Sequence, residues 1–148
     1  MKTVLKIYKL LTVLLLMISF SACSSDDSNE KEPTVSELLE NKWFLLETTD
    51  TSTDPETIEV ANSCSVNSYY NFLNDGTLLV QLYNLDADEN CVSSSLEVFN
   101  YILSADGTKI IVEFENGDIT NIIIDSIDNE FLELYNEETP DYRVLFSK

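Results

Sequence analysis

The sequence of 148 residues contains no histidine, only three glycines, and eight lysine and arginine residues against 27 aspartate and glutamate residues. Without histidine the chain lacks the commonest general base, the commonest zinc ligand and the base of Ser–His and Cys–His nucleophile pairs. Gly76, Gly107 and Gly117 are too far apart to build a glycine-rich phosphate-binding loop. These absences argue against an enzyme, and we expect neither catalytic residues nor a cofactor.

The shortage of basic residues leaves a formal net charge of −19. A chain this acidic repels nucleic acid and anionic lipid headgroups, so we expect no nucleic-acid partner. The many acidic residues also single out no pair of carboxylates for hydrolysis, because none stands in an apolar setting that would raise its pKa. The charge either serves solubility alone or selects the ligands that approach.

The longest apolar run lies at the N-terminus. Three lysines precede the segment 10–20, which is too short to cross a bilayer as a stable helix. Ser21-Ala22-Cys23 follows directly. The segment resembles a bacterial lipoprotein signal, which implies that residues 1–22 are removed and that Cys23 becomes the lipidated first residue. An ordinary secretory signal with an incidental cysteine is the alternative.

A polar, acidic segment, 23–33, follows the signal and is expected to be a flexible tether to a domain over 34–148. Within it, Ser24-Ser25-Asp26-Asp27 resembles the export tag of Bacteroidetes-type surface lipoproteins. That resemblance implies a lipid-anchored protein of the outer membrane, on the cell surface. A plain solvated linker is the alternative. Membrane contact is expected through the lipid on Cys23, since the chain has no basic amphipathic segment.

A short helix and then β-strands are expected from Thr34 onward. Thr34 and Glu37 have the spacing of a capping box, which predicts a helix over 34–40. Apolar alternation and turn signals predict eight strands at 42–49, 66–73, 77–83, 96–103, 108–114, 118–127, 130–135 and 142–147. Residues 50–63 and 84–94 are expected to be long polar loops. No helix-length segment separates the strands, so they should be antiparallel.

Eight sequential antiparallel strands leave two exposed edges unless the sheet closes or splits. We therefore predict an all-β fold, an up-and-down barrel with room inside for side chains or one small ligand. A flat meander or a small sandwich is the alternative. The strand order places both long loops on one rim, here called the mouth. It places the helix at the opposite rim, the base, where Val35, Leu38 and Leu39 can plug the barrel.

Two cysteines remain after Cys23. Cys64 and Cys91 precede the second and fourth expected strands, which run in the same direction, so both should lie at the mouth. An exported protein folds where disulfides form, and we expect these two to be bridged. Two buried free thiols are the alternative.

An ordered set of residues over 34–148 resembles the lipocalin-like domain of Bacteroidetes-type lipoproteins. The set comprises Trp43, Cys64, Tyr70-Asn71-Phe72-Leu73-Asn74-Asp75-Gly76-Thr77, Cys91, Tyr101-Ile102-Leu103-Ser104-Ala105-Asp106-Gly107, Ile122-Ile123-Ile124 and Leu132-Glu133-Leu134. The resemblance implies a lipocalin-like barrel and names no ligand. Lipocalins also place an arginine of a late strand over the first-strand tryptophan, and Arg143 is the candidate for that position.

Strand alternation predicts which side chains face the interior. The inward set is Trp43, Leu45, Tyr70, Phe72, Leu78, Val80, Leu82, Tyr101, Leu103, Ile110, Val112, Phe114, Ile122, Ile124, Leu132, Leu134, Val144 and Phe146. The strands 96–103 and 118–127 also fit the opposite phase. The candidates to line a ligand pocket are the aromatic members Trp43, Tyr70, Phe72 and Tyr101. A filled core is the alternative, since a domain of this size needs most of its apolar side chains to fold.

The expected mouth loops are acidic, which would disfavour anionic ligands and favour neutral or cationic ones. One of them, Asn84-x-Asp86-x-Asp88-x-Asn90, has the oxygen ligands of a calcium loop but lacks glycine at the sixth position and glutamate at the twelfth. Weak calcium binding and an ordinary solvated loop are the two interpretations.

Two functions fit these features. The first is an anchored binding protein that holds a small apolar or neutral ligand at the barrel mouth. The second is a non-catalytic protein–protein interaction module, an accessory subunit or inhibitor, with a filled core.

Overall fold

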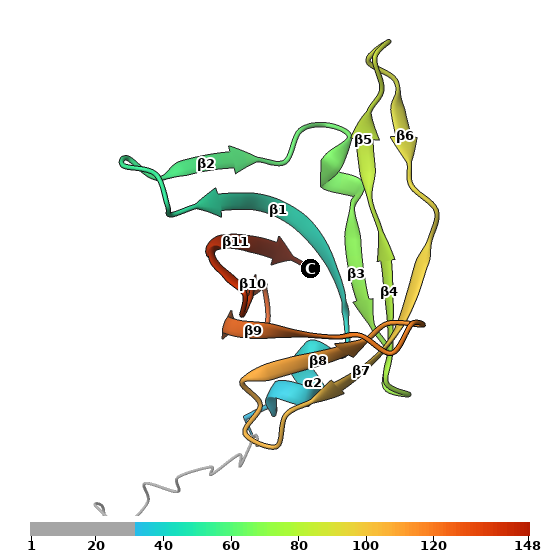
Figure 1. Ribbon diagram of the computed structural model, residues 1–148, viewed down its shortest axis with the longest axis vertical. Helices are drawn as coiled ribbons and strands as arrows, with labels where there is room; N and C mark the ends of the chain where they lie inside the picture. Colours follow the sequence, from blue (N-terminus) through green and yellow to red (C-terminus); the bar gives the residue numbers. More distant parts are fainter. Residues whose placement is uncertain (1–31) are drawn as a thin grey trace, which may run out of the picture. The chain divides into compact units, whose positions relative to one another are not determined.

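The computed structural model describes residues 32–148, and Pro33–Lys148 form one compact unit (Figure 1). The expected signal peptide, Cys23 and residues 24–31 of the expected tether lie outside the described residues, so these segments stay predictions. Within the described range, no helix has both the length and the apolar character needed to cross a membrane.

The unit contains one short α-helix, one turn of 3-10 helix and eleven strands. They are α2 (Val35–Leu39), β1 (Lys42–Asp50), β2 (Thr57–Val60), η1 (Ser65–Asn67, the 3-10 turn), β3 (Tyr69–Phe72), β4 (Thr77–Gln81), β5 (Tyr83–Leu85), β6 (Cys91–Ser93), β7 (Glu97–Leu103), β8 (Lys109–Glu113), β9 (Ile119–Ile127), β10 (Phe131–Asn136) and β11 (Thr139–Ser147).

Eight of these strands close into an antiparallel barrel in the order β1, β3, β4, β7, β8, β9, β10, β11. The last strand returns to the first, with registers from Phe44↔Ser147 to Asp50↔Tyr142. Closure removes both edges of the eight-stranded meander. The prediction of an all-β, up-and-down barrel is confirmed, and a flat meander or sandwich is excluded.

The strand β1 changes its neighbour halfway along its length. Its first residues, Lys42–Phe44, pair with β3, whereas its later residues, Glu47–Asp50, pair with β2. A register shift between Leu45 and Glu47 marks the change, and Figure 1 shows β2 lying along the second half of β1. The expectation that all of 50–63 is loop was therefore wrong, because its second half folds back onto β1.

The prediction that 84–94 is a long loop was also wrong, because the segment contains strand residues. Its ends form the hairpin β5–β6, with Tyr83 opposite Ser93 and Leu85 opposite Cys91. Figure 1 shows this hairpin extending beyond β3 and β4 at the end of the barrel remote from α2. Each of these strands has only three residues, too few for apolar alternation to distinguish it from a loop.

The helix α2 closes the base of the barrel. The expected capping box is present: the Glu37 backbone N–H donates to Thr34 Oγ1 (3.3 Å), and the Thr34 backbone N–H donates to the Glu37 carboxylate (2.7 Å). Leu39 is buried in the core cluster. Val35 lies against the tight turn at Gly107: a Cβ atom added to Gly107 would be only 3.3 Å from the Cβ of Val35. These contacts confirm that the helix plugs the base.

The inward set is confirmed. Leu82 and Phe114 are 41% and 37% exposed because they lie at the open mouth, where they line the interior. The phase of β7 and β9 is settled by Val98, Ile102 and Ile119, which are 57%, 67% and 62% exposed on the outer face.

Candidate ligand-binding cavity

The base half of the barrel is filled with side chains. Trp43 is fully buried, and its indole Nε1–H donates to the Leu39 carbonyl (3.1 Å). Phe72 is 1% exposed and makes an edge-to-face contact with Tyr101, with ring centroids 5.3 Å apart. The Tyr101 hydroxyl donates to the Leu73 carbonyl (3.0 Å). These packed and hydrogen-bonded rings leave no space for a ligand between them.

The mouth half of the barrel is hollow and contains a cavity of about 380 Å³. Its walls come from seven of the eight barrel strands and the residues beside them. The lining residues are Tyr70, Leu78, Val80, Leu82, Glu97, Phe99, Val112, Phe114, Thr120, Ile122, Leu134, Tyr135, Asn136, Thr139, Tyr142, Val144 and Phe146. The interior is therefore divided between a filled base and an open mouth.

The four aromatic pocket candidates are divided in the same way. Tyr70 lines the cavity, whereas Trp43, Phe72 and Tyr101 belong to the closed base. Ligand binding by any of the four stays a prediction. Sequence reasoning did not select the mouth-side lining residues Glu97 and Phe99. The signal that could have found them is strand alternation: residues two apart share a face, so the inward positions Tyr101 and Leu103 imply that Phe99 and Glu97 also point inward.

A few polar groups converge on this apolar space. Glu97 is the one charged residue in the lining, and Tyr70 and Tyr142 contribute phenol groups. Burial raises the pKa of the Tyr70 hydroxyl, and the nearby Glu97 carboxylate and Tyr142 raise it further. The phenol is therefore neutral at physiological pH and is available as a hydrogen-bond donor or acceptor.

None of the basic side chains described in the structure is in the lining of the cavity. They are Lys42, Lys109, Arg143 and Lys148. Arg143 forms ion pairs with Asp125 and Glu133 and lies over the Tyr135 ring. The expectation that Arg143 covers Trp43 was wrong, because Lys148, five residues later, holds that position with its Nζ 4.8 Å from the ring centroid.

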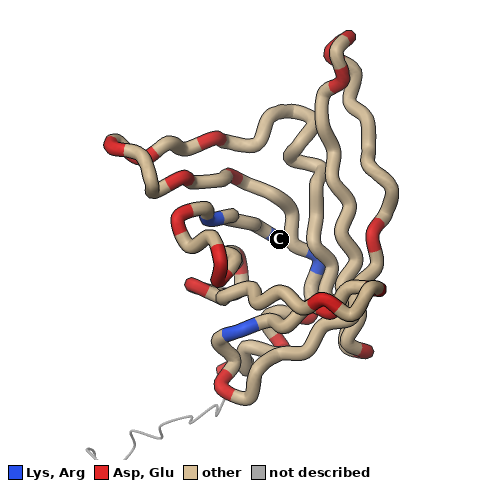
Figure 2. Tube along the Cα trace, in the orientation of Figure 1, with Lys and Arg blue, Asp and Glu red and all other residues tan. Residues whose placement is uncertain are grey.

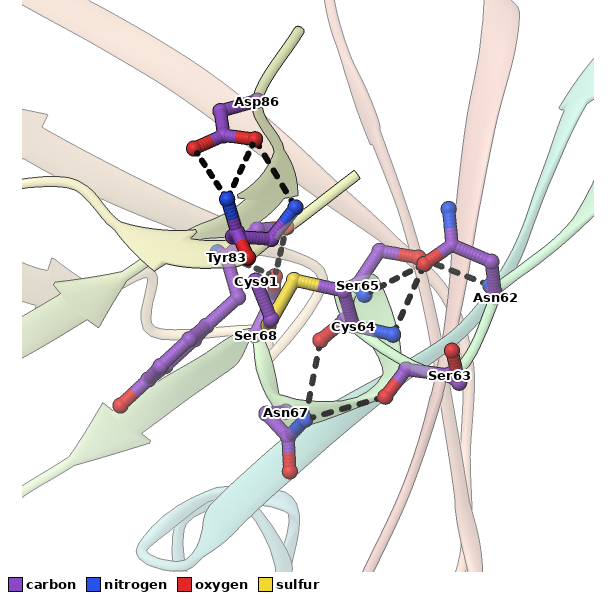
Figure 3. Close-up of a disulfide and its surroundings, with 10 residues drawn as sticks. Asn62, Ser63, Cys64, Ser65, Asn67, Ser68, Tyr83, Asp86 and Cys91 are labelled. Atoms are coloured by element: carbon purple, nitrogen blue, oxygen red, sulfur yellow. Dashed lines mark hydrogen bonds between the residues drawn. A yellow bond between two sulfur atoms is a disulfide. The ribbon is translucent and has the colours of Figure 1, made fainter. Parts of the chain in front are cut away.

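The Cys64–Cys91 disulfide ties the β5–β6 hairpin to η1 beside the mouth (Figure 3). The two Cα atoms are 5.3 Å apart, and the bridge spans 27 residues. The Tyr83 backbone N–H also donates to Ser68 Oγ (2.8 Å). The expected bridge is confirmed, and the alternative of two free thiols is excluded. Because β4 runs into β5, the bridge holds the rim next to the lining residue Leu82.

Asp86 organises the tip of this hairpin. Its Oδ1 accepts from the Asn90 and Asp88 backbone N–H groups at 2.8 and 2.9 Å. These hydrogen bonds lower the pKa of the Asp86 carboxyl, and the bond from the Asn90 backbone has the largest effect. Over residues 32–148, no three acidic, cysteine or histidine side chains are grouped so that they could hold a metal ion. The weak calcium binding considered for Asn84–Asn90 stays untested in solution.

Acidic residues are spread over the loops and turns. Figure 2 shows them at the tip of the β5–β6 hairpin and at the turn between β1 and β2, with few basic positions between them. One cluster is paired: Lys109 Nζ donates to Glu137 Oε1 (2.5 Å), and Asn121 Nδ2 donates to the other oxygen of Glu137 (2.7 Å). The hydrogen bond from Lys109, followed by that from Asn121, lowers the pKa of Glu137.

Comparison with solved structures identifies the architecture. The chain is similar to a lipocalin-like protein from Bacteroides uniformis, with a TM-score of 0.51 and 19% sequence identity. The match covers 74% of this chain and 97% of the other. The sequence matches no protein-family model and no curated protein. At this identity the likeness concerns the fold, and the chain has a lipocalin-like fold.

Proposed function

We propose that the protein binds a small, largely apolar ligand in the mouth half of its barrel. The observation that carries this proposal is the cavity of about 380 Å³ above a filled base. Pockets for small molecules typically measure about 300–1,000 Å³ and combine apolar walls with a few polar groups. The lining has that composition: aliphatic and aromatic side chains with a few polar groups, among them the phenols of Tyr70 and Tyr142 and the carboxylate of Glu97.

The burial of apolar surface supplies the driving force for such binding. Each square ångström removed from water contributes about 25 cal/mol. Val80, Ile122 and Leu134 give the cavity an aliphatic wall, and Phe99 and Phe114 give it an aromatic one. Because the base is already packed around Trp43, a ligand enters only as far as the layer of Leu78 and Phe146.

Fluorescence of N-phenyl-1-naphthylamine, a neutral apolar dye, tests the proposal. The dye should brighten when it binds the wild-type protein, because its emission rises in apolar surroundings. Val144→Trp should abolish the signal, since Val144 lines the cavity and the larger ring would fill it. Val60→Trp is the matched control, because Val60 is 70% exposed on β2.

The two variants also separate folding from binding. Circular dichroism should show the same β spectrum for both. A folded Val144→Trp that still brightens the dye like the wild type would contradict binding inside the barrel. Absence of brightening in the wild type, together with no thermal stabilisation by apolar compounds, would contradict ligand binding altogether.

We further propose that the barrel works at a membrane surface, held by lipid on Cys23. The lipoprotein signal and the acidic Ser24–Asp27 segment support this location. Cells supplied with radiolabelled palmitate should label the wild-type protein, and Cys23→Ala should remain unlabelled and leave the membrane fraction. Protease added to intact cells should digest the wild type if the barrel is on the surface. Labelling of Cys23→Ala would contradict the anchor.

A further inference from the structure

Glu97 is the first residue of β7 and the inward-facing position of that strand nearest the mouth. Along this strand Glu97, Phe99 and Tyr101 alternate with the exposed residues Val98 and Ile102. Since successive side chains of a strand point to opposite faces, Glu97 shares the inner face with Phe99. The pairing agrees, because Glu97 lies opposite Val80, which is 7% exposed inside the barrel.

The carboxylate of Glu97 has no cationic partner in the part of the chain that is described. The ion pairs there join Lys109 to Glu137, and Arg143 to Asp125 and Glu133. Lys42 and Lys148 instead lie over aromatic rings. Glu97 is exposed to solvent at the rim and lines the cavity, so a molecule entering the barrel can reach its charge.

Aromatic rings surround the same end of the cavity. Phe99 and Phe114 meet edge to face, with centroids 5.3 Å apart, and Tyr70 and Tyr142 lie in the same lining. Ring faces attract cations, and the attraction grows as the cation loses water. The raised pKa of Tyr70, to which Glu97 contributes, agrees with a negative potential in this part of the cavity. No positive side chain in the lining offsets that potential.

We propose that the cavity selects apolar molecules that carry a protonated amine, with the ammonium group at Glu97 and the hydrocarbon against Val80, Ile122 and Leu134. This inference rests on the proposed function and adds the class of ligand. An amine places one positive charge beside the one lining carboxylate, whereas a fatty-acid anion would place a second negative charge there. The net charge of −19 raises the local concentration of cations at the mouth as well.

Three probes with the same hydrocarbon cage test the proposal: 1-adamantanamine, 1-adamantanol and 1-adamantanecarboxylate. Titration calorimetry at one fixed salt concentration should show the amine binding the wild type about five- to tenfold more tightly than the alcohol. The carboxylate should bind most weakly. Glu97→Gln should remove most of the preference for the amine over the alcohol, because it replaces the one carboxylate in the lining.

Glu138→Gln is the matched control for the general field of the protein. Glu138 lies in the turn between the lining residues Asn136 and Thr139 but does not itself line the cavity. The control should retain most of the preference for the amine.

Equal affinity of the wild type for the amine and the alcohol would overturn the amine proposal and leave ligand binding standing. A preference that is undiminished in Glu97→Gln, or that falls equally in Glu138→Gln, would also overturn it. Failure of all three probes to bind would overturn both the amine proposal and the proposed function.

Discussion

Trp43 joins the plug of the barrel to its wall. The ring is fully buried in the base, and the indole N–H satisfies the carbonyl of Leu39 at the end of α2 (3.1 Å). A helix of five residues has little stability of its own. Its position therefore depends on tertiary contacts such as this one and the burial of Leu39.

Trp43→Phe should reduce the free energy of unfolding by about 2–4 kcal/mol. The variant loses a buried hydrogen bond and leaves a cavity where the larger ring packed. Urea denaturation followed by far-ultraviolet circular dichroism measures the change. Phe131→Leu, at a position 41% exposed, is the control and should cost less than about 1 kcal/mol. A loss at Trp43 no larger than the control would contradict the role of this contact.

Asp106 gives the turn between β7 and β8 its pH dependence. Its Oδ1 accepts from Ser104 Oγ (2.6 Å), the Thr108 backbone N–H (3.1 Å) and Thr108 Oγ1 (2.9 Å). These hydrogen bonds lower the pKa of Asp106 to about 2, and the bond from the Ser104 side chain has the largest effect. Because this value lies below that of an unfolded chain, about 3.9, the contribution to stability is complete above that pH and is lost as the pH falls towards 2.

Ser104→Ala should raise the pKa of Asp106 towards its ordinary value. Carbon-13 NMR of the Asp106 carboxyl gives the pKa directly in both proteins. The stability difference between wild type and Ser104→Ala should shrink as the pH is lowered from 5 to 2. An unchanged pKa in the variant would show that the hydroxyl does not hold the carboxylate.

Two tight turns differ in their relation to α2: the turn at Gly107 lies at the base beside Val35, and the turn at Gly117 follows β8 at the mouth. Gly107 and Gly117 both have positive φ values, +72° and +85°. A methyl group at Gly107 would lie 3.3 Å from Val35 Cβ, whereas one at Gly117 would meet open space. The pair therefore separates backbone strain from contact with the helix.

Gly117→Ala should cost about 1 kcal/mol of stability, the strain of a left-handed backbone. Gly107→Ala should cost about 1 kcal/mol more, because Val35 must also move. Thermal unfolding of the two variants gives the difference. Equal losses would show that α2 does not press on this turn.

The disulfide ties the β5–β6 hairpin covalently to η1, in addition to its hydrogen bonds with Ser68. Both its strands pair only with each other in the described sheets, and Cys91 is bonded to the buried Cys64. The double variant Cys64→Ala, Cys91→Ala should lose about 3–4 kcal/mol, the chain-entropy value for a bridge spanning 27 residues. Dithiothreitol should lower the melting temperature of the wild type and leave that of the double variant unchanged. A shift in both would contradict the assignment.

The barrel itself could be predicted from the sequence because its signals are local. Alternation placed Ile110 and Val112 inside, and Asp75-Gly76 and Asp106-Gly107 marked turns at the base. The strand β2 could not be predicted, since it forms only where the register shift after Leu45 frees an edge of β1. The division into filled base and open mouth depends on how rings such as Trp43 and Phe72 stack across strands, which alternation does not encode.

The molecule as a whole combines an acidic surface, a plugged base and an open apolar mouth. At the base, large side chains such as Trp43 fill the barrel. Aromatic rings of that size at Val80 and Val144 would fill the mouth in the same way. The shorter side chains there leave the cavity. The chain shares its lipocalin-like fold, and 19% of its sequence, with the Bacteroides uniformis protein. This fold supplies the barrel. The lining residues decide what binds.

Isotope-edited NOE spectroscopy with 1-adamantanol tests the central claim, a ligand-accessible cavity in the mouth half, most directly. Protons of the probe should show NOEs to the methyl groups of Val80, Ile122 and Leu134, which line the cavity. NOEs confined to the outer-face residues Val98 and Ile102, or no NOEs at saturating probe, would contradict the claim.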